Sequence, residues 1–198
     1  RRLEPRIGWS PRPNIDWLRR LRFSAQFRHQ KGVSTGITDE GRWEFGLLGL
    51  DLESGDGFDI NATRKFEYLD RAFFVSEGVK VMPGEYTTLG YRLSVRTTGR
   101  RPVSVYGNAS LGDFWNGERL NFGGRVTFRP NPGVSISTNI QHNRVTLPQG
   151  DFVADVYEVE GQWNPTPWVS AMSQVQFDDV SELVGLFARV RWIVKPGN

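Results

Sequence analysis

Apolar and polar residues alternate along most of the chain after its first sixteen positions. Residues 117–133, GERLNFGGRVTFRPNPG, show this most clearly, with Leu120, Phe122, Val126 and Phe128 in one phase and arginines and an asparagine in the other. A period of two predicts a β-strand with one apolar face and one polar face. The prolines and glycine that close the segment predict a turn.

Nine further runs with the same alternation predict about ten strands in all, with no helix between them. They occupy residues 20–28, 42–54, 58–68, 89–96, 103–111, 134–141, 157–163, 169–177 and 186–192. A change of phase at Leu47 and Leu48 predicts a β-bulge. Most runs are longer than the typical strand of about 5–6 residues and approach the ~9–11 residues that a tilted strand needs to cross a bilayer.

The connections between these runs predict an ordering of loops by side. Short segments with turn chemistry lie at 54–57, 97–101, 129–133, 164–167 and 195–198, and they alternate with longer segments at 30–42, 67–87, 112–118, 143–152 and 178–183. A meander with tight turns on one side and longer loops on the other is typical of outer-membrane barrels. We therefore expect the tight turns to face the periplasm and the longer loops to face outside.

The predicted fold class is all-β, an up-and-down antiparallel transmembrane β-barrel. Residues 17–198 are the barrel segment, with about ten strands that form either the whole barrel or part of a larger one. Residues 1–16 contain three prolines and no period, which predicts a periplasmic entrance or linker segment. Aromatic residues gather near the ends of the runs, as in the two girdles of a membrane barrel.

Composition narrows the classes of protein that fit this pattern. The chain of 198 residues has no run of 18 apolar residues, which excludes a transmembrane helix but not a barrel, whose strands are half polar. It has no cysteine, which excludes disulfides and thiolate metal sites. The net charge of +3 is too mild to favour a nucleic-acid partner. The sequence starts at Arg1 without a signal peptide, so we expect a mature or truncated segment.

The polar phase of the strands is rich in arginine, asparagine, glutamine and serine, which favours the lumen of a barrel over a solvated sheet. These arginines either form a pore wall that favours anions or pair with Glu44, Glu67, Glu158 and Glu160 across the interior. The predicted lumen-lining residues are Arg20, Arg22, Arg28, Arg92, Arg96, Arg125, Arg129, Glu158, Glu160, Arg189 and Arg191.

The segment 67–87 is the longest predicted loop and is unusually apolar. A loop of this composition does not stay loose in water. It extends the sheet above the membrane, folds inward to narrow the lumen, or meets a partner. The residues predicted to form this constriction or partner loop are Phe73, Phe74, Val79, Val81 and Met82.

No set of residues predicts catalysis. The sequence contains no GxSxG, HExxH or P-loop motif. Glu158 and Glu160 are two residues apart on one strand and simply point the same way. We expect no enzyme activity, no catalytic residue, no cofactor and no metal site.

Several phrases at turns and loop mouths resemble an uncharacterised bacterial envelope family. They are VKVMPGEY at 79–86, GDFWNG at 112–117, NRV at 143–145 followed by LP and GDF, and LFARVRW at 186–192 followed by KPGN. The family joins an N-terminal part similar to a family-nine carbohydrate-binding module to a C-terminal outer-membrane β-barrel. The resemblance implies the barrel fold and that members continue past Asn198 into at least one more strand. It implies no catalytic residues.

The expected function is that of an integral protein of the bacterial outer membrane, acting as a pore, an anchor or a scaffold. Its expected partners are outer-membrane lipid and a periplasmic domain, a surface domain or another envelope protein, with no nucleic acid. The alternatives are a structural subunit of a larger envelope assembly and a soluble all-β carbohydrate-binding module. A barrel enzyme that acts on lipid would need a nucleophile and a base, and no convincing set occurs.

Overall fold

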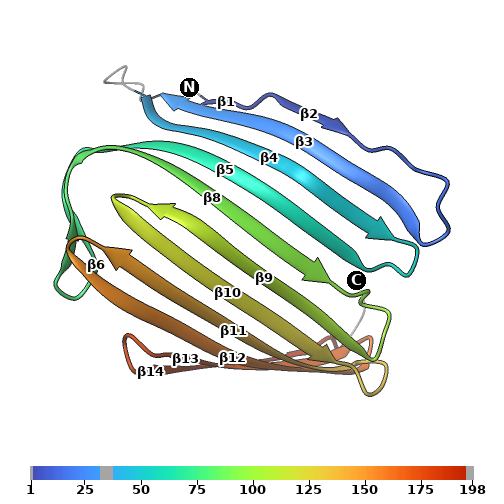
Figure 1. Cartoon of the computed structure of the whole chain (residues 1–198). Helices are drawn as coiled ribbons and strands as arrows, with labels where there is room; N and C mark the ends of the chain where they lie inside the picture. Colours follow the sequence, from blue (N-terminus) through green and yellow to red (C-terminus); the bar gives the residue numbers. More distant parts are fainter. Residues whose placement is uncertain (1, 32–37, 195–198) are drawn as a thin grey trace.

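The computed structural model describes residues 2–31 and 38–194 and contains one large antiparallel sheet (Figure 1). The strand order in this sheet is β1-β3-β4-β5-β8-β9-β10-β11-β12-β13-β14, and β2 also pairs with β3. The bounds are β1 (Arg2–Leu3), β2 (Arg6–Trp9), β3 (Leu18–Lys31), β4 (Thr38–Leu52), β5 (Gly57–Leu69), β8 (Gly84–Arg96), β9 (Val103–Phe114), β10 (Gly117–Phe128), β11 (Val134–Leu147), β12 (Gly150–Thr166), β13 (Val169–Asp178) and β14 (Leu183–Trp192). The strands β6 (Phe73–Ser76) and β7 (Val79–Val81) form a separate hairpin.

The predicted all-β meander is confirmed. Each of the ten predicted runs becomes one long strand. Those of the ten that are consecutive along the chain also pair with each other in the sheet. The predicted bulge is confirmed as well, because the register between β4 and β5 jumps from Gly46 to Leu48. The strands could be predicted because the alternation depends only on residues within each run.

The sheet is open at both margins in the part of the chain that the structure describes. In Figure 1 the blue strands β1 to β3 form one margin of the curved sheet, and the red strand β14 forms the other. There, β14 pairs with β13 and with no other strand. The expected closure into a barrel is therefore not observed.

The predicted sorting of loops into a short side and a long side is wrong. β9 and β10 are joined by a two-residue turn at 115–116, and β11 and β12 by another at 148–149, because the strands extend through most of the expected loops. Within the described residues, only the connection 70–83 is long, and it contains the hairpin. The predicted turn at 195–198 lies outside the described residues, as do residues 32–37 of the loop predicted at 30–42.

The N-terminal segment is extended, as its prolines predict, but it is not separate from the sheet. β1 and β2 pair antiparallel with the outer edge of β3, with Trp9 opposite Phe23. The rings of these two residues are stacked, with centroids 5.5 Å apart. The segment thus covers an edge that would otherwise expose unpaired backbone groups. Its periplasmic position stays a prediction.

The large sheet has a single layer with two unlike faces. Within the described residues, four of the six buried hydrophobic side chains belong to one cluster under the hairpin, so no core extends along the sheet. The apolar face is open, as shown by Phe122, Val126 and Leu186, whose exposed fractions are 45%, 48% and 72%. Soluble domains bury such a face against a second layer. The described residues supply no second layer here.

Candidate functional site

The polar face carries a charge network at one end of strands β3, β4, β5 and β8. Asp51, whose side chain is 3% exposed, accepts Arg20 Nη2 at 2.6 Å and Arg96 Nη2 at 2.8 Å. Asp59 accepts Arg22 Nη2 at 2.6 Å and Arg96 Nη1 at 2.9 Å. Bonds between ionised groups are among the stronger hydrogen bonds. The network therefore ties four neighbouring strands together and uses three of the predicted lumen arginines structurally.

A second cluster joins the two turns next to this network. Asp56, in the turn 53–56, accepts hydrogen bonds from the Thr98 backbone N–H at 2.8 Å, from Arg101 Nη2 at 2.9 Å and from the Ser54 hydroxyl at 2.8 Å. These bonds hold the pKa of the Asp56 carboxyl below its ordinary value, with the largest effect from Arg101, followed by Thr98 and Ser54. This carboxylate thus connects the β4–β5 turn to the β8–β9 turn.

Further along the polar face, some of the predicted arginines have partners on other strands. Arg125 Nη2 lies 3.1 Å from Glu158 Oε1, so one predicted arginine pairs with a predicted glutamate, along the sheet from β10 to β12. Arg129 Nη1 donates to the Ser104 hydroxyl at 2.8 Å. Arg28 pairs with Glu4 of the N-terminal segment. These contacts favour the structural interpretation of the arginines over a continuous cationic wall.

A buried amide connects strands β9, β10 and β11. Asn121 is 7% exposed, and its Nδ2 donates to the His142 carbonyl at 3.2 Å and to Asn143 Oδ1 at 2.8 Å. Its Oδ1 accepts Asn108 Nδ2 at 3.3 Å and the Ser110 hydroxyl at 3.4 Å. Every hydrogen-bonding site of this side chain is used, as a buried polar group requires.

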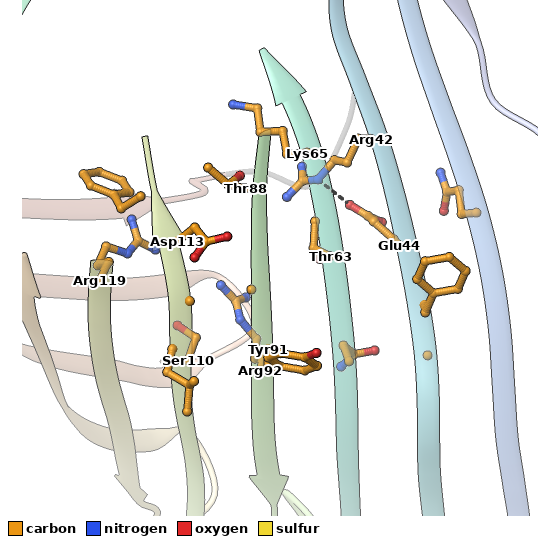
Figure 2. Close-up of a pocket in the computed structure, with 18 of the residues that line it drawn as sticks. Arg42, Glu44, Thr63, Lys65, Thr88, Tyr91, Arg92, Ser110, Asp113 and Arg119 are labelled. Atoms are coloured by element: carbon orange, nitrogen blue, oxygen red, sulfur yellow. Dashed lines mark ion pairs between the residues drawn. The ribbon is translucent and has the colours of Figure 1, made fainter. Parts of the chain in front are cut away.

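A cavity of about 630 Å³ opens on the polar face beside this amide (Figure 2). Two of the predicted acidic partners lie in it, but their cations are not the predicted ones. Arg42 Nε lies 3.0 Å from Glu44, and Lys65 Nζ lies 3.0 Å from Glu67. Both pairs lie within one strand, two residues apart, so they form without any contact across a lumen.

The apolar hairpin of β6 and β7 covers the polar face at the end opposite the Asp51 network. Val79 and Val81 are buried against Val145 and Leu147 of β11. Val145 pairs with Arg119, which lines the cavity, so this cluster lies on the polar face. The loop thus folds onto the polar face of the sheet.

The five residues predicted as one loop site do not share one environment. Val79 and Val81 are core residues, and Phe73 is partly buried against them. Phe74 and Met82 are exposed by 66% and 52%. A narrowed lumen and a partner contact both stay predictions.

Besides Arg92 and Arg129, three further predicted residues make no ion pair with any described residue. Glu160, Arg189 and Arg191 lie on the polar face opposite Gln174, Met172 and Ser170, respectively. Arg92 lines the cavity and is discussed below.

Several polar-face residues were missing from the prediction. Asp51 and Asp59 fall in the polar phase of their strands, and this phase alone could have placed them on the same face as the arginines. Arg119 and Asn121 lie in the polar phase of β10 and had the same signal. Their individual partners depend on the register between strands, which no local pattern contains.

The comparisons with known proteins add no relative from which a role could be transferred. No family model, no curated protein and no solved structure matches this chain. Within residues 2–31 and 38–194, no group of three or more His, Asp or Glu residues is placed to hold a metal ion. No helix in that part of the chain is long and apolar enough to cross a membrane. The resemblance to the envelope family stays a prediction.

Proposed function

We propose that this chain forms the wall of a β-barrel in the bacterial outer membrane and that its polar face lines a passage for polar solutes. The observation that carries the proposal is the exposed apolar face of the single-layered sheet. On β10, for example, Leu120, Phe122, Val126 and Phe128 point the same way and are 39–48% exposed. On β9 the partners of all four residues are apolar. On β11 the partner of Phe128 is Ile136, and the other three partners are Thr138, His142 and Arg144.

Lipid is the partner whose chemistry fits this face. Burying apolar surface contributes about 25 cal/mol per Å², so a face this large is strongly driven to leave water. The ten long strands, β3 to β5 and β8 to β14, have 10–17 residues each, enough for the ~9–11 that a crossing requires. The opposite face holds the paired charges and amides, which suits a water-filled or polar interior.

Membrane insertion also demands that backbone groups be paired, since lipid offers them no hydrogen bonds. The outer edge of β14 has no partner among the described residues. Our proposal therefore includes closure of the sheet by further strands, in keeping with the envelope family that the sequence resembles.

An anchor or scaffold role is the second candidate. The specific observation in its favour is that the hairpin of β6 and β7 covers one end of the polar face, while the Asp51 network fills the other. A barrel closed in this way would hold its partners in the membrane without conducting.

Two measurements on the same preparation separate these possibilities. We expect the protein to remain with the membrane through carbonate washing and to require detergent for extraction. In planar bilayers, we expect ohmic conductance steps. A folded, detergent-extracted protein that never conducts would contradict the pore and favour the anchor. A protein that stays folded and soluble without detergent would contradict both and favour a soluble binding module.

A further inference from the structure

We propose that the cavity on the polar face binds a tetrahedral oxyanion, the phosphate or sulfate group of a small solute, between Arg92 and Arg119. The inference deepens the proposed function, on which it rests for the route by which the ligand reaches the site. Figure 2 shows both arginines in the same hollow, on β8 and β10, with Ser110 and Asp113 of β9 beside them.

The other charges of the cavity are largely neutralised. Arg42 and Glu44 pair at 3.0 Å, and Lys65 and Glu67 pair at 3.0 Å. These four side chains contribute no net charge to the hollow. The net charge of the cavity is therefore set by its arginines without such partners and by Asp113.

Arg92 and Arg119 are left without a carboxylate partner among the described residues. The guanidinium of Arg119 lies over the Phe114 ring at 5.1 Å. The nearest acid on the strand between them, Asp113, instead accepts the Leu89 backbone N–H at 2.9 Å. Both guanidiniums belong to the same hollow, one from β8 and one from β10 (Figure 2). An anion placed between them would offset both positive charges.

The strand between the two arginines places no side chain at Gly112, which lines the cavity together with Gly90. Gly112 of β9 pairs with Gly90 of β8 on one side and with Arg119 of β10 on the other. A Cβ atom at Gly112 would lie 2.3 Å from the Leu89 carbonyl oxygen, so only glycine fits there. The next polar-face position on β9 is Ser110, whose small hydroxyl side chain lines the cavity. The floor of the site is therefore backbone and a hydroxyl group.

The shape of the two cations favours a tetrahedral oxyanion over a carboxylate. Each guanidinium presents a planar fork of N–H donors that binds two oxygens at once. Two forks from opposite sides match the oxygens of phosphate or sulfate, whereas a carboxylate has only two oxygens to share. Phosphate and sulfate share this chemistry, and direct comparison distinguishes them.

Calorimetric titration of the folded protein in detergent micelles tests the site, with sodium phosphate, sodium sulfate and sodium acetate at constant ionic strength. We expect saturable binding of phosphate or sulfate and weaker binding of acetate. Arg92→Gln and Arg119→Gln should each raise Kd by about ten-fold or more, because each removes a charged fork. Arg189→Gln is the matched control, since Arg189 lies on the same face without an ion pair to any described residue but outside the cavity.

The outcomes are distinct. Absence of saturable binding to folded wild-type protein would overturn the site, as would equal losses in Arg189→Gln, and acetate that binds as well as phosphate would overturn the tetrahedral ligand. Circular dichroism verifies that each variant is folded. A barrel that needs detergent but fails to bind anions would refute this inference alone. A protein that folds without detergent would instead refute the proposed membrane function.

Discussion

Leu93 and Ser94 are adjacent on β8, yet they belong to opposite faces of the sheet. Leu93 is 41% exposed on the apolar face, whereas Ser94 lies opposite Asp59 on the polar face. In a barrel, the same new side chain would meet lipid at one position and the polar interior at the other. This pair of residues therefore reports the environment of each face with the strand held constant.

We expect Leu93→Arg to lower the free energy of unfolding by about 2–4 kcal/mol, because a guanidinium near the middle of the bilayer loses its hydration. Ser94→Arg should change it little, since the new cation would lie beside the Asp59 carboxylate. Urea titration of the protein in lipid vesicles measures both values. Equal effects at the two positions would contradict the assignment of the faces.

Asp51 is the residue on which the charge network depends most. Its carboxylate contacts Arg20 and Arg96 and also lies 3.2 Å from Arg22 Nε. We expect Asp51→Asn to destabilise the fold by about 1–3 kcal/mol, since Arg20 would lose its carboxylate and Asp59 alone would remain for Arg22 and Arg96. Glu160→Gln is the control, because Glu160 has no ion pair with any described residue. Denaturant titration measures the loss of stability in both variants. A loss in Asp51→Asn no larger than that in Glu160→Gln would show that the ion pairs of Asp51 do not stabilise the fold.

At the scale of the elements, the turns are fixed by single carboxylates. Asp56 accepts bonds that join the β4–β5 turn to the β8–β9 turn, and these bonds lower its pKa. A lowered carboxyl pKa stabilises the folded state above the unfolded pKa of about 3.9. That contribution is lost as the pH falls through the lower, folded pKa.

Asp56→Asn should therefore reduce stability by a constant amount at pH 5 and above. The difference from wild type should shrink as the pH falls below about 4, because Asp56 is then protonated in the unfolded chain and, at lower pH, in the folded protein as well. Denaturant titrations at pH 6 and pH 3 give the two differences. A difference that stayed the same at both values would show that Asp56 acts without its charge.

The strands could be predicted from the sequence, and their ends could not. The alternation of Leu120, Phe122, Val126 and Phe128 is local, so it fixed the strand and its faces. The ends of β9 to β12 depend on pairing with neighbours, which carries these strands through segments that resemble loops. The position of the β6–β7 hairpin could not be predicted for a similar reason, since it depends on contact with Val145 and Leu147.

For the whole molecule, the predicted site differs from the observed one because contacts between strands are not contained in local sequence patterns. The arginines of the polar face could be predicted from phase alone. Which of them are neutralised could not, because Arg22 meets Asp59 from 37 residues away and Arg125 meets Glu158 from 33. Of the two alternatives left open by the sequence, register therefore favours pairing for most of these arginines and leaves Arg92 in the cavity without an ion pair to any described residue.

The central claim is that one face of this single sheet contacts lipid. The chain has no cysteine, so single cysteines introduced along residues 119–129, in β10 and directly after it, can each carry a nitroxide label. In lipid vesicles, we expect labels at 120, 122, 126 and 128 to collide with oxygen, which concentrates in the bilayer. Labels at 119, 121, 125 and 129 should collide instead with a water-soluble nickel complex. Alternation with a period of two would support the barrel wall, and equal access of the nickel complex to both sets would contradict it.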